Sequence, residues 1–380
     1  MATTEARKHL ADAHRIVVKV GTHVVTHDGV ELALGRIMEI VEGLARLRHA
    51  GREIVLVSSG AVGMGMRVLG LKERPRSLGM RQACAAVGQG HLMSLYTDAF
   101  AQLDVVAAQV LLTQEDLADR DRALCLRTTL MRLLELGVVP VLNENDSVSV
   151  QELVEHRRVQ AGAAVTAPAA FGDNDGLSAR VAVSLDADLL VLLTNVGGLY
   201  TANPRIDPAA ALISELAGVD DAALARADGG SAGGTGGMAS KLEAAHLASS
   251  EGTAVLIAGG GDARVVERAL AGEDVGTLIA VAARRTARIR HIAVGARHRG
   301  ALVVNDGALR ALAGEASLLP IGVVGVEGTF DKGDVVEIRD GSGRVHAAAW
   351  STTPPTRAGS WPGGTATTSM PSLAGGAMTS

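Results

Sequence analysis

Short apolar runs alternate along the chain with longer segments in which apolar residues recur every three or four positions. The runs are rich in β-branched residues and short enough to be buried strands of a parallel sheet. They span residues 15–20, 53–57, 105–112, 137–142, 189–193 and 253–258. The longer segments have the periodicity of helices that pack on one face. They span residues 37–47, 82–102, 120–136 and 242–249. This alternation predicts an α/β fold with a mainly parallel sheet sandwiched by helices, and we expect the sheet to be complete at Ala258.

Two clusters of acidic and amide side chains lie at the ends of predicted elements. One is Asn-Glu-Asn-Asp at positions 143–146, directly after the run 137–142, and the other is Gly-Asp-Asn-Asp at positions 172–175. Ligands of parallel sheets bind at the carboxyl ends of the strands, so both clusters are candidates for one site. Their carboxylates would need a substrate ammonium group, a metal or lysines to balance them. Turn and helix N-cap roles are the alternative for Asn and Asp, and the sequence leaves both interpretations open.

A lysine, Lys19, interrupts the β-branched run that ends before Gly21. A lysine inside a buried strand is rare unless its ammonium group reaches the strand end or an anion. We therefore favour a phosphate-facing role for Lys19 over an aliphatic stem that extends to solvent.

Two glycine-rich segments precede predicted helices. Positions 58–61 read Ser-Ser-Gly-Ala, and positions 233–241 read Gly-Gly-Thr-Gly-Gly-Met-Ala-Ser-Lys. Glycines let a backbone approach phosphate oxygens, and a helix N-terminus adds partial positive charge. The spacing of Lys241 differs from that of a Walker A loop, and glycine-rich turns without a ligand are the alternative for both segments. A third segment, residues 194–205, would suit a purine pocket but is a weak signal by itself.

The pattern of apolar and polar residues changes after Gly276. A basic connector at 284–290 precedes short strand-like pieces at 301–305, 323–326 and 334–339, which predict a small β-rich domain. Of the last 30 residues, 21 are Ser, Thr, Gly or Pro, and this composition predicts a disordered tail because it cannot form a core. We therefore expect one domain at 1–278, an incomplete second domain at 282–349 and a tail at 350–380.

Composition narrows the class of protein. The 380 residues are 47% hydrophobic, enough for a large core. A net charge of −5 and an aromatic content of 2% argue against a dominant nucleic-acid-binding role. Residues 1–13 contain no apolar signal-peptide core, and no apolar run is long enough for a membrane span, so we expect a cytoplasmic protein. Cys84 and Cys125 lack metal-ligand spacing and predict reduced thiols.

As an ordered set, the motifs resemble those of the amino-acid kinase family, and within it the kinases that phosphorylate glutamate at the start of proline biosynthesis. The resemblance extends from about Arg15 to about Arg344, and its final part is similar to a PUA domain. The segments that carry it are residues 17–22, 58–61, 143–146, 172–175, 198–201 and 234–241 for the kinase part, and 300–304 and 317–322 for the PUA part.

The resemblance implies roles for particular residues. Catalytic roles fall on Lys19, Lys241, Asp173 and Asp175, with Asp175 holding the two lysines in place. Contacts to ATP, used with Mg²⁺, fall on Lys19, Thr194, Asn195, Thr235, Gly236, Gly237, Met238, Ala239, Ser240 and Lys241. Contacts to L-glutamate fall on Ser59, Asn143, Asp146 and Asn174. No residue is expected to bind a metal directly. Three features depart from the family pattern. Asn195 stands where many members have aspartate, and the segment 151–170, which we interpret as a lid or excursion, is longer than usual. After about Val345 the chain stops resembling a PUA domain and becomes the low-complexity tail.

The same resemblance implies partners. They are L-glutamate as substrate, proline as a feedback inhibitor, glutamate-5-semialdehyde dehydrogenase as the downstream enzyme, and further copies of the chain in a homo-oligomer. The alternatives are an amino-acid kinase acting on aspartate or N-acetylglutamate, and an RNA-binding protein that uses the PUA-like domain. The acidic clusters argue against a phosphate monoester as acceptor because they would repel a dianion, but they discriminate less well among amino acids.

Overall fold

The chain folds into two compact units in the computed structural model. The first comprises Met1–Leu117 and Asp121–Arg284, and the second includes Arg285–Ser380. The structure describes residues 4–27, 31–75, 77–148, 174–204, 206–220, 223–224, 237–281, 298–313, 322–328 and 335–350.

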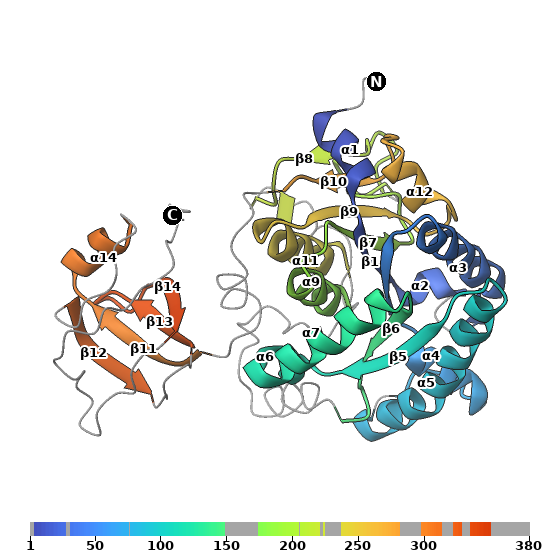
Figure 1. The fold of residues 1–380 in the computed structure, drawn as a ribbon, viewed down its shortest axis with the longest axis horizontal. Coiled ribbons are helices and arrows are strands. Elements are labelled where there is room, and N and C mark those ends of the chain that lie inside the picture. Colours follow the sequence, from blue (N-terminus) through green and yellow to red (C-terminus); the bar gives the residue numbers. More distant parts are fainter. Residues whose placement is uncertain are drawn as a thin grey trace. The chain divides into compact units, whose positions relative to one another are not determined.

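An eight-stranded sheet forms the centre of the first unit (Figure 1). Six neighbouring strands, from β5 to β9, run parallel, β10 is antiparallel to β9, and β8 is parallel to β10. In sheet order the strands are β5 (Ala107–Leu112), β6 (Val139–Glu144), β4 (Glu53–Ser58), β1 (Arg15–Val20), β7 (Leu189–Thr194), β9 (Ala254–Gly259), β10 (Thr277–Ile279) and β8 (Glu215–Leu216). A separate two-stranded hairpin consists of β2 (Thr26–His27) and β3 (Glu31–Leu32).

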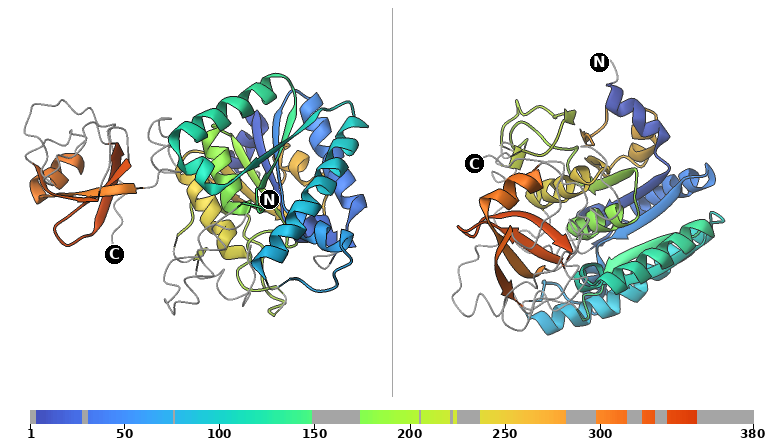
Figure 2. Two further views of the ribbon diagram at one scale, coloured as in Figure 1. Left: turned by 90° about the horizontal axis from the view of Figure 1, so that it is seen from below. Right: turned by 60° about the vertical axis from the view of Figure 1, so that its left-hand side comes forward.

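Helices cover both faces of this sheet. One face packs against α3, α5 and α12, and the other against α7, α9 and α11 (Figures 1 and 2). The helices of the first unit are α1 (Glu5–His9), α2 (Thr22–Val25), α3 (Leu34–His49), α4 (Ala61–Val68), α5 (Leu78–Ala101), α6 (Gln114–Ala118), α7 (Arg120–Glu135), α9 (Asn174–Ser184), α11 (Met238–Ser250) and α12 (Val265–Leu270), with a short 3₁₀ turn at Leu10–Asp12.

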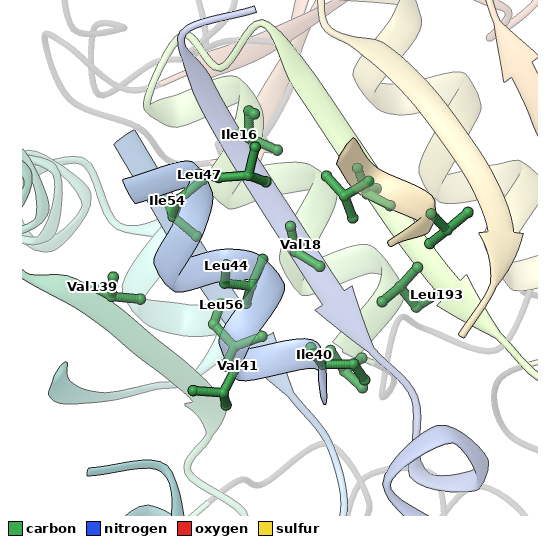
Figure 3. Packing of buried hydrophobic residues seen from close by; sticks show 14 of the residues in the cluster. Ile16, Val18, Ile40, Val41, Leu44, Leu47, Ile54, Leu56, Val139 and Leu193 are labelled. Atoms are coloured by element: carbon green, nitrogen blue, oxygen red, sulfur yellow. The ribbon is translucent and has the colours of Figure 1, made fainter. Parts of the chain in front are cut away.

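The core under α3 shows how the alternation along β1 places Lys19. Ile16 and Val18 point to the same side as Leu44 and Leu47 of α3, and all four are buried in one apolar cluster (Figure 3). Successive strand residues face opposite sides, so Lys19 points away from this cluster, toward the face that α9 covers.

The strand order reverses at β1. The chain adds β4, β5 and β6 on one side of β1 and later adds β7 and β9 on the other. Such a reversal opens a crevice at the carboxyl ends of the two strands next to it, where ligands of open α/β sheets bind. The motifs of the sequence that follow β1, β4, β6 and β7 therefore reach one edge of the sheet.

The expectation that the sheet is complete at Ala258 is wrong. β10 pairs with β9 beyond that point, and β8 pairs with β10 at the end of the sheet. Strands of two or three residues leave too little periodicity to be read from sequence. The first unit therefore includes the polypeptide up to at least Ile279.

The beginning of the chain is held against this late edge of the sheet by a buried arginine. The guanidinium of Arg7, on α1, donates to the carbonyls of Glu273, Val275 and Gly276 and to the carbonyl of Ser214, at 2.7–3.2 Å. It also forms an ion pair with a carboxylate nearby, that of Asp274, at 3.0 Å. Arg7 is 1% exposed, and its contacts join positions 266–269 residues apart in the sequence.

The second unit contains a four-stranded sheet and one helix. The strand order is β12-β11-β13-β14, with β11 parallel to β13 and the two outer pairs antiparallel. The elements are β11 (His298–Val304), α14 (Asp306–Ala313), β12 (Val323–Gly328), β13 (Val335–Arg339) and β14 (Val345–Trp350). β14 extends one residue past the predicted end of this domain at 349, so Trp350, the first residue of the predicted tail at 350–380, belongs to a strand, and the rest of that tail lies outside the described residues.

Candidate active site

Three charged side chains meet at the carboxyl edge of the sheet. The Lys19 ammonium lies 2.7 Å from one carboxylate oxygen of Asp175, and the Lys241 ammonium lies 3.0 Å from the other. The hydroxyl of Ser240 also donates to the second oxygen, at 3.1 Å. The Lys19, Lys241 and Asp175 side chains are 3%, 6% and 0% exposed. Asp175 therefore holds two buried ammonium groups together.

The elements that carry these residues explain their meeting. Lys19 is near the end of β1, whereas Asp175 and Lys241 are in the first turns of α9 and α11, which lie side by side (Figure 1). Both helices thus begin at the edge where β1 ends. A carboxylate in the first turn of a helix is favoured by the helix dipole, and first-turn amides have no partner within the helix. In α11 the first turn follows Gly237 and includes Met238 and Ala239, so it can receive phosphate oxygens.

A second cluster, built from side-chain amides, lies at the same edge of the sheet, and its Asn174 is the sequence neighbour of Asp175. The Asn174 side-chain nitrogen is 2.8 Å from Asn143 Oδ1, 2.9 Å from Ser59 Oγ and 3.2 Å from the carbonyl oxygen of Ser58. Asn143 Nδ2 in turn donates to Gln89 Oε1, at 2.7 Å. The ends of β4 and β6 and the start of α9 are thereby joined by hydrogen bonds, and the structure brings Ser59, Asn143 and Asn174 together as predicted.

One polar atom of this amide cluster lacks a partner. Asn174 is 8% exposed, and among the described residues its Oδ1 has no hydrogen-bond donor. A buried acceptor without a donor costs about 1–3 kcal/mol. Within the part of the chain that the structure describes, the cluster is therefore short of one N–H or O–H donor, which a ligand can supply.

A buried tyrosine supports the loop that follows β4. Tyr96, on α5, is 1% exposed, and its hydroxyl lies 2.8 Å from Ser58 Oγ. Burial raises the pKa of Tyr96 to about 12, and the hydrogen bond from Ser58 offsets this only in part. Ser58 is thus fixed on its side-chain oxygen by Tyr96 while its carbonyl accepts from Asn174.

The predicted nucleotide residues at the end of β7 are less densely bonded. Thr194 is buried, and its carbonyl accepts from Gly260 at 2.7 Å, whereas its hydroxyl is 3.4 Å from the Asn195 side-chain oxygen. Thr277 of β10 fixes the following turn, because its hydroxyl accepts from the Leu199 amide at 2.8 Å. These contacts place the turn at the same sheet edge as Lys19.

Comparison with known proteins agrees with this geometry. The model of the amino acid kinase family matches residues 14–259, more than half of the chain. The chain belongs to the amino acid kinase family. The PUA domain matches residues 300–351, which covers the second sheet. The predicted fold class, an α/β kinase fold with a small β-rich PUA domain, is confirmed.

Curated members of the amino acid kinase family resemble this chain over most of their length. The protein named glutamate 5-kinase of Gloeobacter violaceus is 48% identical over 333 residues, 86% of each chain. The glutamate 5-kinase of Moorella thermoacetica is 46% identical over 357 residues, 93% of this chain and 90% of its own. That of Carboxydothermus hydrogenoformans is 44% identical over 344 residues, 90% of this chain and 88% of its own.

Two further residues predicted from the family pattern follow strands β6 and β7. Asp146 lies in the turn after β6, partly exposed, and Asn195 is exposed after β7. Asp173, Thr235 and Gly236 lie outside the described residues, as does the predicted lid at 151–170. Their roles stay predictions.

Two residues of the clusters escaped the sequence analysis. Gln89 and Tyr96 lie on α5 seven positions apart, which is two helical turns, so they share one face with buried Leu92 and Met93. A polar residue on an otherwise apolar helical stripe was the available signal. The pattern of residues 82–102 predicts only a helix that packs on the sheet, and it does not mark this polar position as part of a site.

The described residues also bear on metals and membranes. They contain no group of three or more His, Cys, Asp or Glu side chains arranged to hold a metal ion. No helix among them combines the length and apolar character required to cross a bilayer.

The Tyr96–Ser58 bond leads to a prediction about alkaline stability. Tyr96→Phe is expected to lower the free energy of unfolding at pH 7 by about 1 kcal/mol, because one buried hydrogen bond is lost. Unfolded tyrosine ionises near pH 10, whereas folded Tyr96 has a pKa of about 12. The native state of the wild type therefore loses stability relative to the unfolded state as pH rises from about 10 toward 12.

The advantage of the wild type over Tyr96→Phe should accordingly shrink between pH 9 and pH 11. Urea unfolding of both proteins across this range measures it. A stability difference that stays constant with pH would contradict the raised pKa of Tyr96.

Proposed function

We propose that this chain transfers the γ-phosphoryl group of ATP to the side-chain carboxylate of L-glutamate. In the reaction, a carboxylate oxygen forms a bond to the γ-phosphorus while the bond from that phosphorus to the β–γ bridging oxygen breaks. The products are L-glutamyl 5-phosphate and ADP. The observation that carries the proposal is the pair of buried ammonium groups of Lys19 and Lys241, held by Asp175 at the carboxyl edge of the sheet.

This reaction needs charge compensation more than proton transfer. The reference pKa of a glutamate side chain is about 4.3, so the acceptor is already ionised at neutral pH and needs no general base. The barrier comes from bringing one anion to another. An ammonium group has three N–H donors, so Lys19 and Lys241 can contact phosphate oxygens while Asp175 orients them. Positioning and electrostatic stabilisation of this kind supply most of the catalysis of phosphoryl transfer.

The amide cluster supports a zwitterionic acceptor. The only N–H donor of free glutamate is its ammonium group. This group can donate to Asn174 Oδ1, which has no donor among the described residues. Ser59 Oγ accepts a hydrogen bond from Asn174, so its own proton can be donated to a carboxylate. The predicted contact of Asp146 with the substrate ammonium adds the opposite charge.

The site fits ATP with Mg²⁺ bound to its phosphates. The first turn of α11 supplies amides and Lys241 for phosphate oxygens. Asp175 and Asp173, the carboxylates that the resemblance assigns to the catalytic site, would help to place the ion together with phosphate oxygens and water. When bound, Mg²⁺ neutralises charge on the β- and γ-phosphates.

The partners implied by the resemblance are part of the proposal. Glutamyl 5-phosphate is a mixed anhydride that water hydrolyses, so a reductase such as glutamate-5-semialdehyde dehydrogenase would consume it. Feedback inhibition by proline and assembly into a homo-oligomer complete the expected properties. Charge compensation by Lys19 and Lys241 does not depend on any of these partners.

The proposal predicts acceptor-dependent ADP release. With ATP and Mg²⁺, L-glutamate should support turnover, and hydroxylamine should trap the acyl phosphate as a hydroxamate. L-glutamine, which has the same length but no side-chain carboxylate, is the matched control and should support neither. Faster turnover with L-aspartate or N-acetyl-L-glutamate would transfer the proposal to another acceptor, and ADP release without hydroxamate formation would contradict acyl phosphate synthesis.

A further inference from the structure

We infer that Gln89 is a positioning residue of the acceptor subsite, which it serves by fixing the side-chain amide of Asn143. The inference rests on the proposed function for the identity of the acceptor. It assigns a role to α5, a helix that none of the sequence motifs includes.

The contact is direct. Gln89 Oε1 accepts from Asn143 Nδ2 at 2.7 Å, and Asn143 Oδ1 accepts from Asn174 Nδ2 at 2.8 Å. Asn143 is 3% exposed, so few waters can replace either bond. Gln89 is thus one end of a short chain of amides that leads to the unpartnered Asn174 Oδ1.

The polarity of this chain is set from both ends. A carbonyl oxygen can only accept, so the bond to the Ser58 carbonyl orients the Asn174 amide with its nitrogen toward β4. Asn143 must then present its oxygen to Asn174, which leaves its nitrogen facing α5. A group on α5 that accepts a hydrogen bond stabilises this orientation, and Gln89 provides it.

Loss of the Gln89–Asn143 hydrogen bond should weaken the binding of the acceptor and leave the binding of the nucleotide unchanged. If Asn143 is free to rotate, the two N–H groups of Asn174 lose one of the three oxygens around them, and Asn174 Oδ1 no longer has one fixed position for a substrate ammonium. Lys19 and Lys241 are held by Asp175 and have no described bond to Gln89. The predicted signature is therefore a higher KM for glutamate with an unchanged KM for ATP.

Gln89→Met tests the inference because it keeps the length of the side chain and removes the acceptor. The KM for glutamate is expected to rise about 10-fold, the equivalent of one hydrogen bond of about 1.4 kcal/mol, while the KM for ATP changes less than about twofold. Gln89→Glu retains an acceptor oxygen and should stay within about threefold of the wild type for glutamate. Gln102→Met is the matched control, since Gln102 is exposed at the end of the same helix, and it should change neither KM.

A double-mutant cycle separates positioning from a general structural effect. If Gln89 acts through Asn143, Gln89→Met should have no further effect on the KM for glutamate in an Asn143→Ala background. Additive effects would overturn the inference, as would equal losses in Gln89→Met and Gln89→Glu, or equal rises of both KM values. Melting temperatures of all variants identify any that fail to fold, and the Gln89→Glu comparison still decides if Gln89→Met does.

Failure of the inference and failure of the proposed function give different results. If glutamate is not the acceptor, the wild type itself shows no glutamate-dependent turnover. If Gln89 has no positioning role, the wild type is active and Gln89→Met matches Gln102→Met.

Discussion

Replacing Lys241 or Lys19 with alanine is expected to lower kcat for glutamate phosphorylation at least about 100-fold, because each change removes about 3 kcal/mol of charge compensation in the transition state. Each single variant leaves an ion pair between Asp175 and the remaining lysine, so the fold should persist. Lys19→Met and Lys241→Met keep the apolar stem and should lose as much activity as the alanine variants. Steady-state ADP release measures the effect.

Lys8→Ala is the control for this experiment. Lys8 is an exposed lysine on α1 whose described ion pair is with Glu5, and its loss should leave kcat unchanged. Near-normal turnover in both the Lys19 and the Lys241 variants would remove these residues from the reaction. A loss of activity that merely follows a loss of folded protein, measured by circular dichroism, would assign them a structural role instead.

Gly88→Ala adds a single methyl group, and it is expected to lower the free energy of unfolding by about 3 kcal/mol or more. A Cβ at Gly88 would lie 1.8 Å from the Ala61 carbonyl oxygen and 2.4 Å from the Gly65 nitrogen. Both are backbone atoms of α4, so relief requires α4 and α5 to separate. Since α4 begins two residues after Ser59, the separation should also raise the KM for glutamate.

Gly90→Ala is the matched control for this change. Gly90 is exposed on the same helix, and a Cβ there meets nothing within 4 Å. Alanine is favoured over glycine in a helix interior by up to about 1 kcal/mol, so Gly90→Ala should raise the free energy of unfolding slightly. Equal effects of the two substitutions in urea unfolding would show that α4 and α5 do not approach as closely as described.

The sequence predicted the parts of the fold that have long, regular patterns. Five of the six parallel strands, all but the edge strand β5, are largely apolar runs buried on both faces, and such runs are visible in one dimension. β8 and β10 were missed because two or three residues have no period, and their pairing depends on partners far away in the chain. The start of α9 was missed for another reason: the polar pair Asn174 and Asp175 forms its first turn, so a cluster of acidic and amide residues begins a helix that the apolar pattern did not mark.

The sequence predicted those candidate site residues whose type is unusual for their position. An inward-facing lysine in an apolar strand identified Lys19, and the repeated amide and acidic clusters identified Asn143, Asn174 and Asp175. Sequence did not indicate which atoms pair, because hydrogen-bond polarity depends on the register of β4, β6 and α9. Gln89 and Tyr96 contribute through that pairing, so the sequence pattern of α5 marks them as polar positions but only the structure shows which groups they bond.

The Arg7 contacts determine which edge of the first unit can form last. Strands β1, β4, β5 and β6 lie within the first 144 residues, so this side of the sheet can assemble while the ribosome is still adding the other side. The carbonyl partners of Arg7 follow only at Ser214 and at residues 273–276. During synthesis α1 must therefore wait for nearly the whole first unit, and closure of this long loop, an entropically costly contact, completes the edge formed by β10 and β8.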